Sequence, residues 1–305
     1  MLEVIGIMTL VGALSLGIFI HHYGLERTKT IFAKIYCKIY QNEEKNLKPI
    51  MVPITTKPFG IDASIYQGTM DWDKVEIETL TGKKKVQFAY IKATESTNSD
   101  WLYNYHRKGT QRNRIVSGAY HVMHPWIDGT EQARYYMKTA NLNPSDLPPA
   151  LDLEMEYLEK SEKKVGKEKT LKNIIDWLRV VEEESHCKPI IYSSVNAFTG
   201  ILNTLALDKY DRWVARYSIT KSPSIDWSFW QFSCKGKVTG VTINYVDLNL
   251  WNGTEASLEE WRKSHWKTVG EEMSAKTQAT KKENASKEKK TRNKKATNSK
   301  HTEKK

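Results

Sequence analysis

Two acidic side chains, Asp152 and Glu154, lie two positions apart in the apolar stretch PPALDLEM. In a β-strand, residues two positions apart point to the same face. A strand here would therefore place both acids on one face and the neighbouring apolar residues on the other. The acidic face is either the solvated side of a half-exposed strand or the working face of a catalytic site. This stretch alone favours neither interpretation.

Two neighbouring acids are suited to cleaving a glycosidic bond. Carboxylates crowded into a cleft raise each other's pKa, so at least one stays protonated near neutral pH while others remain charged. The protonated acid can then donate to the leaving oxygen while a charged one stabilises the oxocarbenium-like centre. Metal binding is the competing use of clustered acids, but the sequence has no EF-hand loop and no paired histidines. We therefore expect no metal and no cofactor.

Polar side chains also end most of the other predicted strands. They are Asp62 in FGID, Glu95 in AYIKATE, His121 in GAYH, Tyr192 and Ser193 in IIYS, Tyr217 in WVARY, Gln231 in FWQF and Asp247 in NYVDLN. In a parallel barrel the carboxyl ends of the strands meet at one face, so these groups would converge on one pocket holding four or five carboxylates. This recurrence favours the catalytic interpretation of the first pair.

The elements that must position these residues alternate along the chain. Short runs rich in β-branched and aromatic residues recur from Phe59 onward: FGID, VQFAYIKAT, VSGAYHV, PALDLEM, KPIIYSS, RWVARY, FWQF and VDLNLW. Between several of them lie segments with helical character, namely DWLYNYHRKGTQRN, GTEQARYYMKTANL and EKTLKNIIDWLRVVEEESH. Alternating strands and helices indicate a largely parallel sheet. About eight strands fit a closed or nearly closed (β/α) barrel better than a sandwich.

Aromatic residues are numerous, with ten Trp and 15 Tyr in 305 residues. Several flank the predicted acids: Tyr66, Tyr120, Trp126, Tyr192, Trp213, Tyr217 and Trp230. Aromatic rings offer a flat apolar face and a polar edge, which suits pyranose rings. By contrast, Trp72, Trp177 and Trp261 lie on helical patterns, and we predict that they are structural.

Both ends of the chain differ in composition from the middle. Residues 1–23 contain the uncharged run Val4–Ile20, which predicts a membrane anchor, a cleaved signal or a buried helix. Residues 24–57 are a basic linker, and residues 58–267 form the predicted globular domain. Residues 268–305 form a lysine-rich tail with few hydrophobic residues, which we predict to be disordered.

The formal charge of +11 is concentrated in that tail. From Ser274 to Lys305 there are 11 Lys and one Arg against three Glu, a net charge of +9. Such a tail attracts polyanions without sequence specificity, so it is either a tether for anionic envelope polymers or only a solvated end. No basic patch interleaved with aromatic residues indicates a specific nucleic-acid partner. Cys37, Cys187 and Cys234 lack metal-ligand spacing and are predicted to be isolated thiols.

Seven motifs taken together resemble glycoside hydrolase family 25, the Chalaropsis-type lysozymes. In order they are FGIDASIYQGTMDW, AYIKATES, GAYHV, PALDLE, RWVARY, WQFS and VDLN. The resemblance implies a flattened, irregular (β/α) TIM-like barrel that cleaves the β-1,4 bond between N-acetylmuramic acid and N-acetylglucosamine in peptidoglycan. Two positions depart from the family pattern, because Ser96 replaces a glycine and Val122 replaces an aromatic residue. Neither changes a carboxylate, so we expect activity to be retained.

The resemblance also implies roles for individual residues. Glu154 would be the general acid and Asp152 its partner, with Asp62 and Asp247 as flanking carboxylates. We expect the sugar groove to be lined by Tyr66, Glu95, Tyr120, His121, Tyr192, Tyr217, Trp230 and Gln231. Whether a protein carboxylate or the substrate's 2-acetamido group acts as the nucleophile stays open. Our hypothesis is acetamido assistance, with Asp152 orienting the amide.

The sequence therefore predicts a monomeric lysozyme (N-acetylmuramidase) whose partner is the peptidoglycan glycan strand. The alternatives are a wall-binding module without catalysis and a polyanion-binding protein that uses the tail. Basic residues after Val4–Ile20 favour a cytoplasmic location for the main domain, but long domains are translocated despite local charge. We expect a membrane-anchored enzyme with its catalytic domain outside the cytoplasmic membrane, or a secreted one if the run is cleaved.

Overall fold

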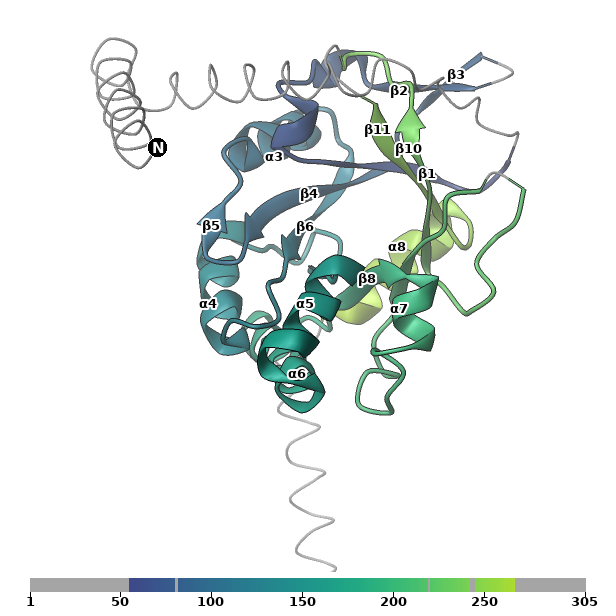
Figure 1. The fold of residues 1–305 in the computed structure, drawn as a ribbon. Coiled ribbons are helices and arrows are strands. Elements are labelled where there is room, and N and C mark those ends of the chain that lie inside the picture. The colour runs from purple at the N-terminus through teal and green to yellow at the C-terminus, as the bar shows by residue number, and fades with distance from the viewer. Residues whose placement is uncertain (1–54, 80–81, 219, 242–244, 267–305) are drawn as a thin grey trace, which may run out of the picture. The chain divides into compact units, whose positions relative to one another are not determined.

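A computed structural model describes residues 55–79, 82–218, 220–241 and 245–266 (Figure 1). The hydrophobic run Val4–Ile20, most of the linker and the lysine-rich tail lie outside these residues, so the anchor and the disordered tail stay predictions. Within the described ranges, no helix combines the length and the apolar composition that crossing a membrane requires.

Eight strands close into a barrel. In pairing order they are β1 (Phe59–Ala63), β11 (Val246–Trp251), β10 (Phe229–Gly236), β9 (Arg212–Ala215), β8 (Ile190–Ser194), β7 (Ala150–Asp152), β6 (Val116–Val122) and β4 (Phe88–Glu95), and β4 pairs back with β1. All pairs are parallel except those of β11, which runs antiparallel to β10 and β1. These strands coincide with the eight predicted runs, which confirms the (β/α) barrel.

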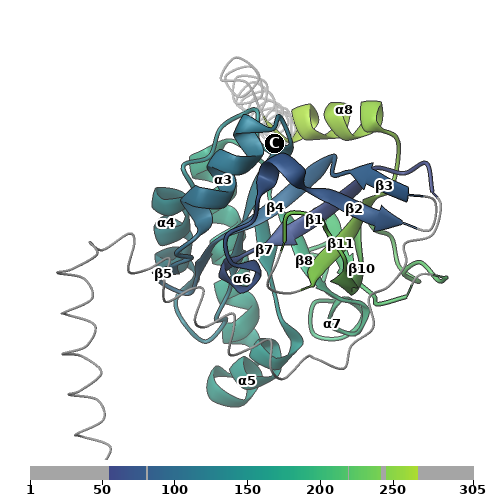
Figure 2. The ribbon, with the colours of Figure 1, turned by 90° about the horizontal axis from the view of Figure 1, so that it is seen from above.

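Helices cover the barrel unevenly, as Figures 1 and 2 show. The connections from β4 to β9 carry α3 (Tyr103–Arg112), α4 (Gly129–Ala140), α5 (Met155–Val165), α6 (Lys167–Ser185) and α7 (Val195–Thr199), and α8 (Glu255–His265) follows β11. In the described residues between β9 and β11 the connections contain no helix, so the barrel is irregular. The three predicted helical segments correspond to α3, α4 and α6.

Three short strands and two 3₁₀ turns complete the described chain. The strands β2 (Glu76–Thr79) and β3 (Gly82–Lys85) pair as an antiparallel hairpin. The two-residue strand β5 (Asn98–Ser99) pairs with the end of β4. The 3₁₀ turns, Ile65–Gln67 and Trp72–Lys74, lie between β1 and β2. These pieces extend the loops around the barrel without adding to its closed sheet.

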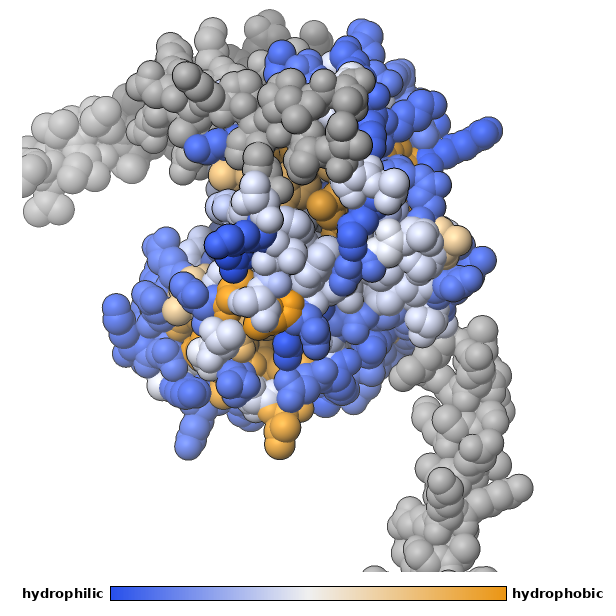
Figure 3. Space-filling view, turned by 90° about the vertical axis from the view of Figure 1, so that its right-hand side faces the viewer, coloured by the Kyte–Doolittle hydropathy of each residue, from blue (hydrophilic) through white to orange (hydrophobic). Residues whose placement is uncertain are grey.

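The hydrophobic core has two layers. One layer lies between the strands and the helices and contains the predicted structural residues Trp72 and Trp177, both buried. The other fills the barrel interior with aromatic rings, in which Tyr90 stacks on Trp213 with 4.7 Å between ring centroids. Trp261 of α8 packs against Phe229 at one end of this interior. Hydrophobic residues appear only as small patches on the mostly hydrophilic face in Figure 3.

The strand that was expected to carry both Asp152 and Glu154 is shorter than the alternating pattern predicts. The strand β7 ends at Asp152, and α5 begins at Met155, so Glu154 is the N-cap residue of this helix. The backbone of Glu154 nevertheless stays extended, with φ −72° and ψ 136°. Because the chain remains extended through Leu153, Asp152 and Glu154 still reach the same pocket.

Candidate active site

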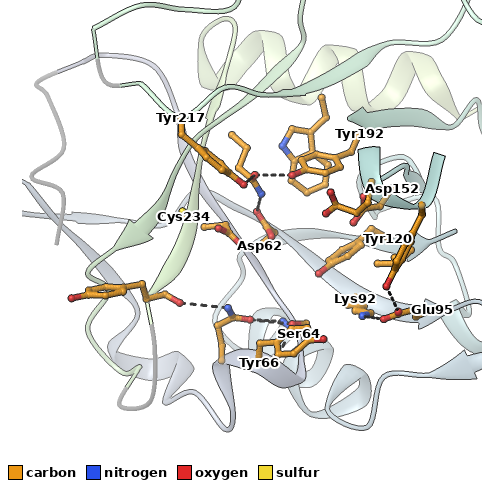
Figure 4. Close-up of a pocket in the computed structure, with 18 residues that line it drawn as sticks. Asp62, Ser64, Tyr66, Lys92, Glu95, Tyr120, Asp152, Tyr192, Tyr217 and Cys234 are labelled. Atoms are coloured by element: carbon orange, nitrogen blue, oxygen red, sulfur yellow. Dashed lines mark hydrogen bonds and ion pairs between the residues drawn. The ribbon is translucent and has the colours of Figure 1, made fainter. Parts of the chain in front are cut away.

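A pocket of about 420 Å³ lies at the carboxyl ends of the parallel barrel strands (Figure 4). It is lined by Asp62, Ser64, Tyr66, Gln67, Lys92, Glu95, Tyr120, Val122, Asp152, Glu154, Tyr157, Tyr192, Trp213, Tyr217, Gln231, Cys234, Tyr245 and Asp247. The convergence predicted from the strand ends is therefore present. All four predicted catalytic carboxylates line this one pocket.

The topology explains how four distant residues meet. Asp62 lies near the end of β1, and Asp152 is the last residue of β7. Asp247 lies near the start of β11, but β11 runs antiparallel, so its start is at the same end of the barrel as the ends of the other strands. Asp62 and Asp247 are direct cross-strand partners.

Asp152 and Glu154 differ in exposure although both acids face the pocket. Asp152 is buried, and burial, followed by the charge of Glu154, raises its pKa well above the usual range. The Glu154 side chain is exposed as a whole, yet its carboxyl is partly desolvated by the pocket. That desolvation, followed by the charge of Asp62, raises the pKa of Glu154. Both shifts favour the protonated forms of these acids, which is the direction that a general acid requires.

Asp62 lies in a different environment, because its carboxylate receives hydrogen bonds. Its Oδ2 accepts from Nδ2 of Asn249 at 2.8 Å and from Nε2 of Gln231 at 3.0 Å. Burial raises the pKa of Asp62, and hydrogen bonds with Asn249, Gln231 and Asp247 oppose that rise. Asp62 is thus a pocket carboxylate whose charged form has two buried amide donors.

An ion pair forms another wall of the pocket. Lys92 pairs with Glu95, which also accepts from the Tyr157 hydroxyl at 3.2 Å and lies 3.4 Å from Nε2 of His124. The hydrogen bond with His124, followed by the charge of Lys92, outweighs burial and lowers the pKa of Glu95 to about 2. Glu95 is therefore ionised near neutral pH.

Both partners of this ion pair face inward because of an irregularity in β4. Lys92 and Glu95 are three positions apart, which simple alternation would place on opposite faces. The register between β4 and β6 shifts between Lys92 and Thr94, so the alternation resets there. Glu95 thereby returns to the pocket side, and Thr94 points outward to His121.

The structure places two predicted groove residues outside the pocket, His121 and Trp230. On β6 the inward residue is Tyr120, so its neighbour His121 points outward, bonds Thr94 at 2.7 Å and stacks on Trp177. Burial lowers the pKa of His121 to about 3, so this imidazole is neutral. On β10 the inward residue is Gln231, and Trp230 points outward, donating to the carbonyl of Arg216. Adjacent strand residues face opposite sides, so neither pair could share the pocket.

The other predicted groove residues do line the pocket: Tyr66, Glu95, Tyr120, Tyr192, Tyr217 and Gln231. Tyr217 is 60% exposed and Tyr66 is 38% exposed, which places polar-edged rings within reach of a ligand. Tyr192 is buried deeper and donates to Oε1 of Gln231 at 2.8 Å. The walls therefore combine aromatic faces with hydrogen-bonding groups, as sugar recognition needs.

Eight lining residues were not predicted as site residues: Ser64, Gln67, Lys92, Val122, Tyr157, Trp213, Cys234 and Tyr245. Strand alternation could have found Lys92, two positions after Tyr90, and Val122, two positions after Tyr120. Tyr157 could not be found in this way, because it lies on α5, which the sequence did not predict. Cys187 and Cys234 are both in thiol form, as predicted. Among the described residues, no cluster of His, Cys, Asp and Glu has the arrangement of a metal site.

Comparison with known proteins relates the whole barrel to one family. Residues 61–241 match the family model described as glycosyl hydrolases family 25. The uncharacterized protein YegX of Escherichia coli (strain K12) is 33% identical over 215 residues, which cover 69% of this chain and 75% of YegX. Lysozyme M1 of Streptomyces globisporus is 31% identical over 212 residues, covering 65% of this chain and 69% of that protein.

Solved structures give the same relationship. The crystal structure of the bacterial lysozyme from Streptomyces coelicolor has a TM-score of 0.60 and 27% identity, and the match covers 70% of this chain and all of that one. A family 25 glycosyl hydrolase from Bacillus anthracis has a TM-score of 0.59 at 24% identity, covering 70% of this chain and 99% of that one. At 24% identity, the second likeness shows a shared fold only.

Proposed function

Since the chain belongs to glycosyl hydrolase family 25 and is a glycoside hydrolase, we propose that it is a peptidoglycan N-acetylmuramidase. It would cleave the β-1,4 bond between N-acetylmuramic acid and N-acetylglucosamine. The observation that carries this proposal is the joint position of Asp152 and Glu154 after β7, in a pocket walled by tyrosines. The substrate lies in the cell wall, so the site of action is outside the cytoplasmic membrane. Anchoring through Val4–Ile20 stays a prediction.

Glu154 is the proposed general acid because it is ionisable, reachable and partly desolvated. A raised pKa lets Glu154 keep its proton to a higher pH than an ordinary glutamate does, and exposure in the pocket lets that proton reach the glycosidic oxygen. As the bond between C1 and this oxygen breaks, Glu154 becomes a carboxylate. It can then take a proton from the water that attacks C1 in the second step.

Asp152 is the proposed partner of the substrate's 2-acetamido group. Asp152 lines the pocket, so its carboxylate can accept a hydrogen bond from an amide N–H of the substrate. In this scheme the acetamido oxygen bonds to C1 while the leaving oxygen departs, and Asp152 takes up the amide proton. Water then opens the resulting ring and the amide proton returns.

This scheme predicts net retention at the anomeric carbon, because C1 is displaced twice from opposite faces. During early turnover of purified cell wall, proton NMR should detect the β-anomer of the new muramic reducing end before mutarotation. The same sample after equilibration identifies both anomer signals and is the control. An α-anomer appearing first would contradict acetamido assistance and indicate direct attack by water.

A further inference from the structure

Two buried amides are aimed at one oxygen of Asp62. Asn249 and Gln231 are cross-strand partners on β11 and β10, and both donate to Oδ2 of Asp62. Asn249 is 1% exposed and Gln231 is 3% exposed, so water does not replace these donors. A carboxylate that accepts several such bonds is stabilised in its charged form.

The orientation of the Asn249 amide is fixed by its second contact. Nε1 of Trp213 donates to Oδ1 of Asn249 at 2.8 Å. Because the indole nitrogen is only a donor, it must face the amide oxygen, which leaves the amide NH₂ directed at Asp62. Trp213 is itself held by stacking on Tyr90, with 4.7 Å between centroids. Asn249 therefore cannot turn its oxygen towards Asp62 without losing a buried bond.

The Gln231 amide is oriented by the same logic. Its Oε1 accepts from the hydroxyls of Tyr192 at 2.8 Å and Tyr217 at 3.1 Å. With both donors on the oxygen, the NH₂ group is left to face Asp62. Thus two independently oriented amides present N–H groups to Asp62, while Oδ1 of Asp152 has no donor among the described residues.

We propose that Asn249 is a positioning residue that favours the charged form of Asp62, so that a proton is held by Asp152 or Glu154 rather than by Asp62. This inference rests on the proposed function for its catalytic meaning. Asn249 does not line the pocket, so it acts on the reaction through the two lining residues that it contacts, Asp62 and Trp213. A fixed negative charge at Asp62 would stabilise the positive charge that develops at C1, and it keeps the general acid protonated.

Several titratable groups face Asp62 from the elements around it. They are Asp247 on β11, Tyr90 and Lys92 on β4, Tyr120 on β6, Asp152 and Glu154 after β7, Tyr192 on β8 and Tyr217 after β9. Burial raises the pKa of the four tyrosines, so they stay neutral in the acidic range. A change in the acidic range therefore reports on the carboxyl groups.

The test is Asn249→Asp in the full-length protein, which replaces the NH₂ donor by an oxygen and leaves an acceptor for Trp213. Asp62 then loses a donor and gains an acidic neighbour, so its pKa rises by about one unit or more. Carboxyl ¹³C NMR of labelled aspartate, titrated with pH, measures this shift without needing turnover. In the rate profile, the acidic limb of kcat/KM should move to higher pH by the same amount, with about tenfold lower kcat and nearly unchanged KM.

The matched control is Asn252→Asp, the same change just beyond the end of β11. Asn252 is exposed, lies outside the pocket and accepts a hydrogen bond from Lys57 at 2.6 Å. In the Asn252→Asp variant, Asp62 should therefore titrate as it does in wild type. Trp213→Phe keeps a ring but removes the N–H that orients Asn249, and should shift the titration in the same direction by less. Thermal melting checks that each variant is folded.

If Asn249→Asp folds and its Asp62 titrates as in wild type, the inference is overturned. If Asn249→Asp does not fold, a wild-type titration of Asp62 in Trp213→Phe overturns it instead. Wild-type protein that fails to cleave cell wall would instead refute the proposed function. In that case the NMR titration still decides whether Asn249 sets the charge of Asp62.

Discussion

Glu154→Gln is expected to lower kcat on cell-wall peptidoglycan by about 10³-fold or more, because the proposed proton donor to the leaving oxygen is lost. Glutamine keeps the size of the side chain and leaves the N-cap position of α5 occupied. The fold should survive, since Glu154 makes no side-chain capping bond to this helix. Binding to insoluble wall should persist, because the tyrosine walls and the other carboxylates are unchanged.

The matched control is Glu156→Gln, an exposed acid two residues later that does not line the pocket. In a zymogram with cell wall in the gel, Glu156→Gln should give a cleared band like that of wild type. Glu154→Gln should give no cleared band. Full clearing by Glu154→Gln would remove Glu154 from the chemistry. Equal loss in both variants would point to damage of α5 rather than to a missing acid.

Asp152→Asn is expected to reduce kcat by about 10²- to 10³-fold with a smaller change in KM. Asparagine fills the same volume but cannot accept the amide proton that the acetamido group loses. It also removes a buried acid whose charge contributes to the raised pKa values of Tyr120 and Tyr192. Exogenous azide should not restore turnover, because in this scheme the nucleophile belongs to the substrate.

Asp128→Asn serves as the comparison for this second variant. Asp128 caps α4 by accepting from the backbone N–H of Glu131, and asparagine caps helices equally well. Its activity should match wild type. Recovery of Asp152→Asn by azide, with formation of a glycosyl azide, would show instead that Asp152 is a covalent nucleophile.

The alternation of short apolar runs with helical segments was sufficient to predict the barrel. All eight apolar runs became barrel strands because each buries a face on both sides of the sheet, which a continuous apolar run encodes directly. Asp62, Asp152 and Glu154 could be assigned to one pocket from the order of elements, since they lie at the carboxyl ends of parallel strands. Asp247 reaches the same pocket because β11 runs antiparallel, which the sequence did not predict.

The parts that could not be predicted depend on exact register. His121 and Trp230 were expected in the groove from the family resemblance, but the inward positions belong to Tyr120 and Gln231. The bulge in β4 that returns Glu95 to the pocket leaves no clear trace in AYIKATE. Strand alternation could have placed Asn249 on the inward face, because it lies two positions after Asp247. Its proposed role depends on hydrogen bonds with Trp213 and Asp62, which form only when the barrel closes.

The central claim is that this pocket cleaves the muramic side of the glycan linkage. The most direct measurement is to digest purified peptidoglycan with the full-length protein, reduce the soluble products with borohydride and identify the reduced terminal sugar by mass spectrometry. Muramidase activity predicts that N-acetylmuramic acid carries the reduced end, and that Glu154→Gln yields none. Products reduced at N-acetylglucosamine would contradict the account.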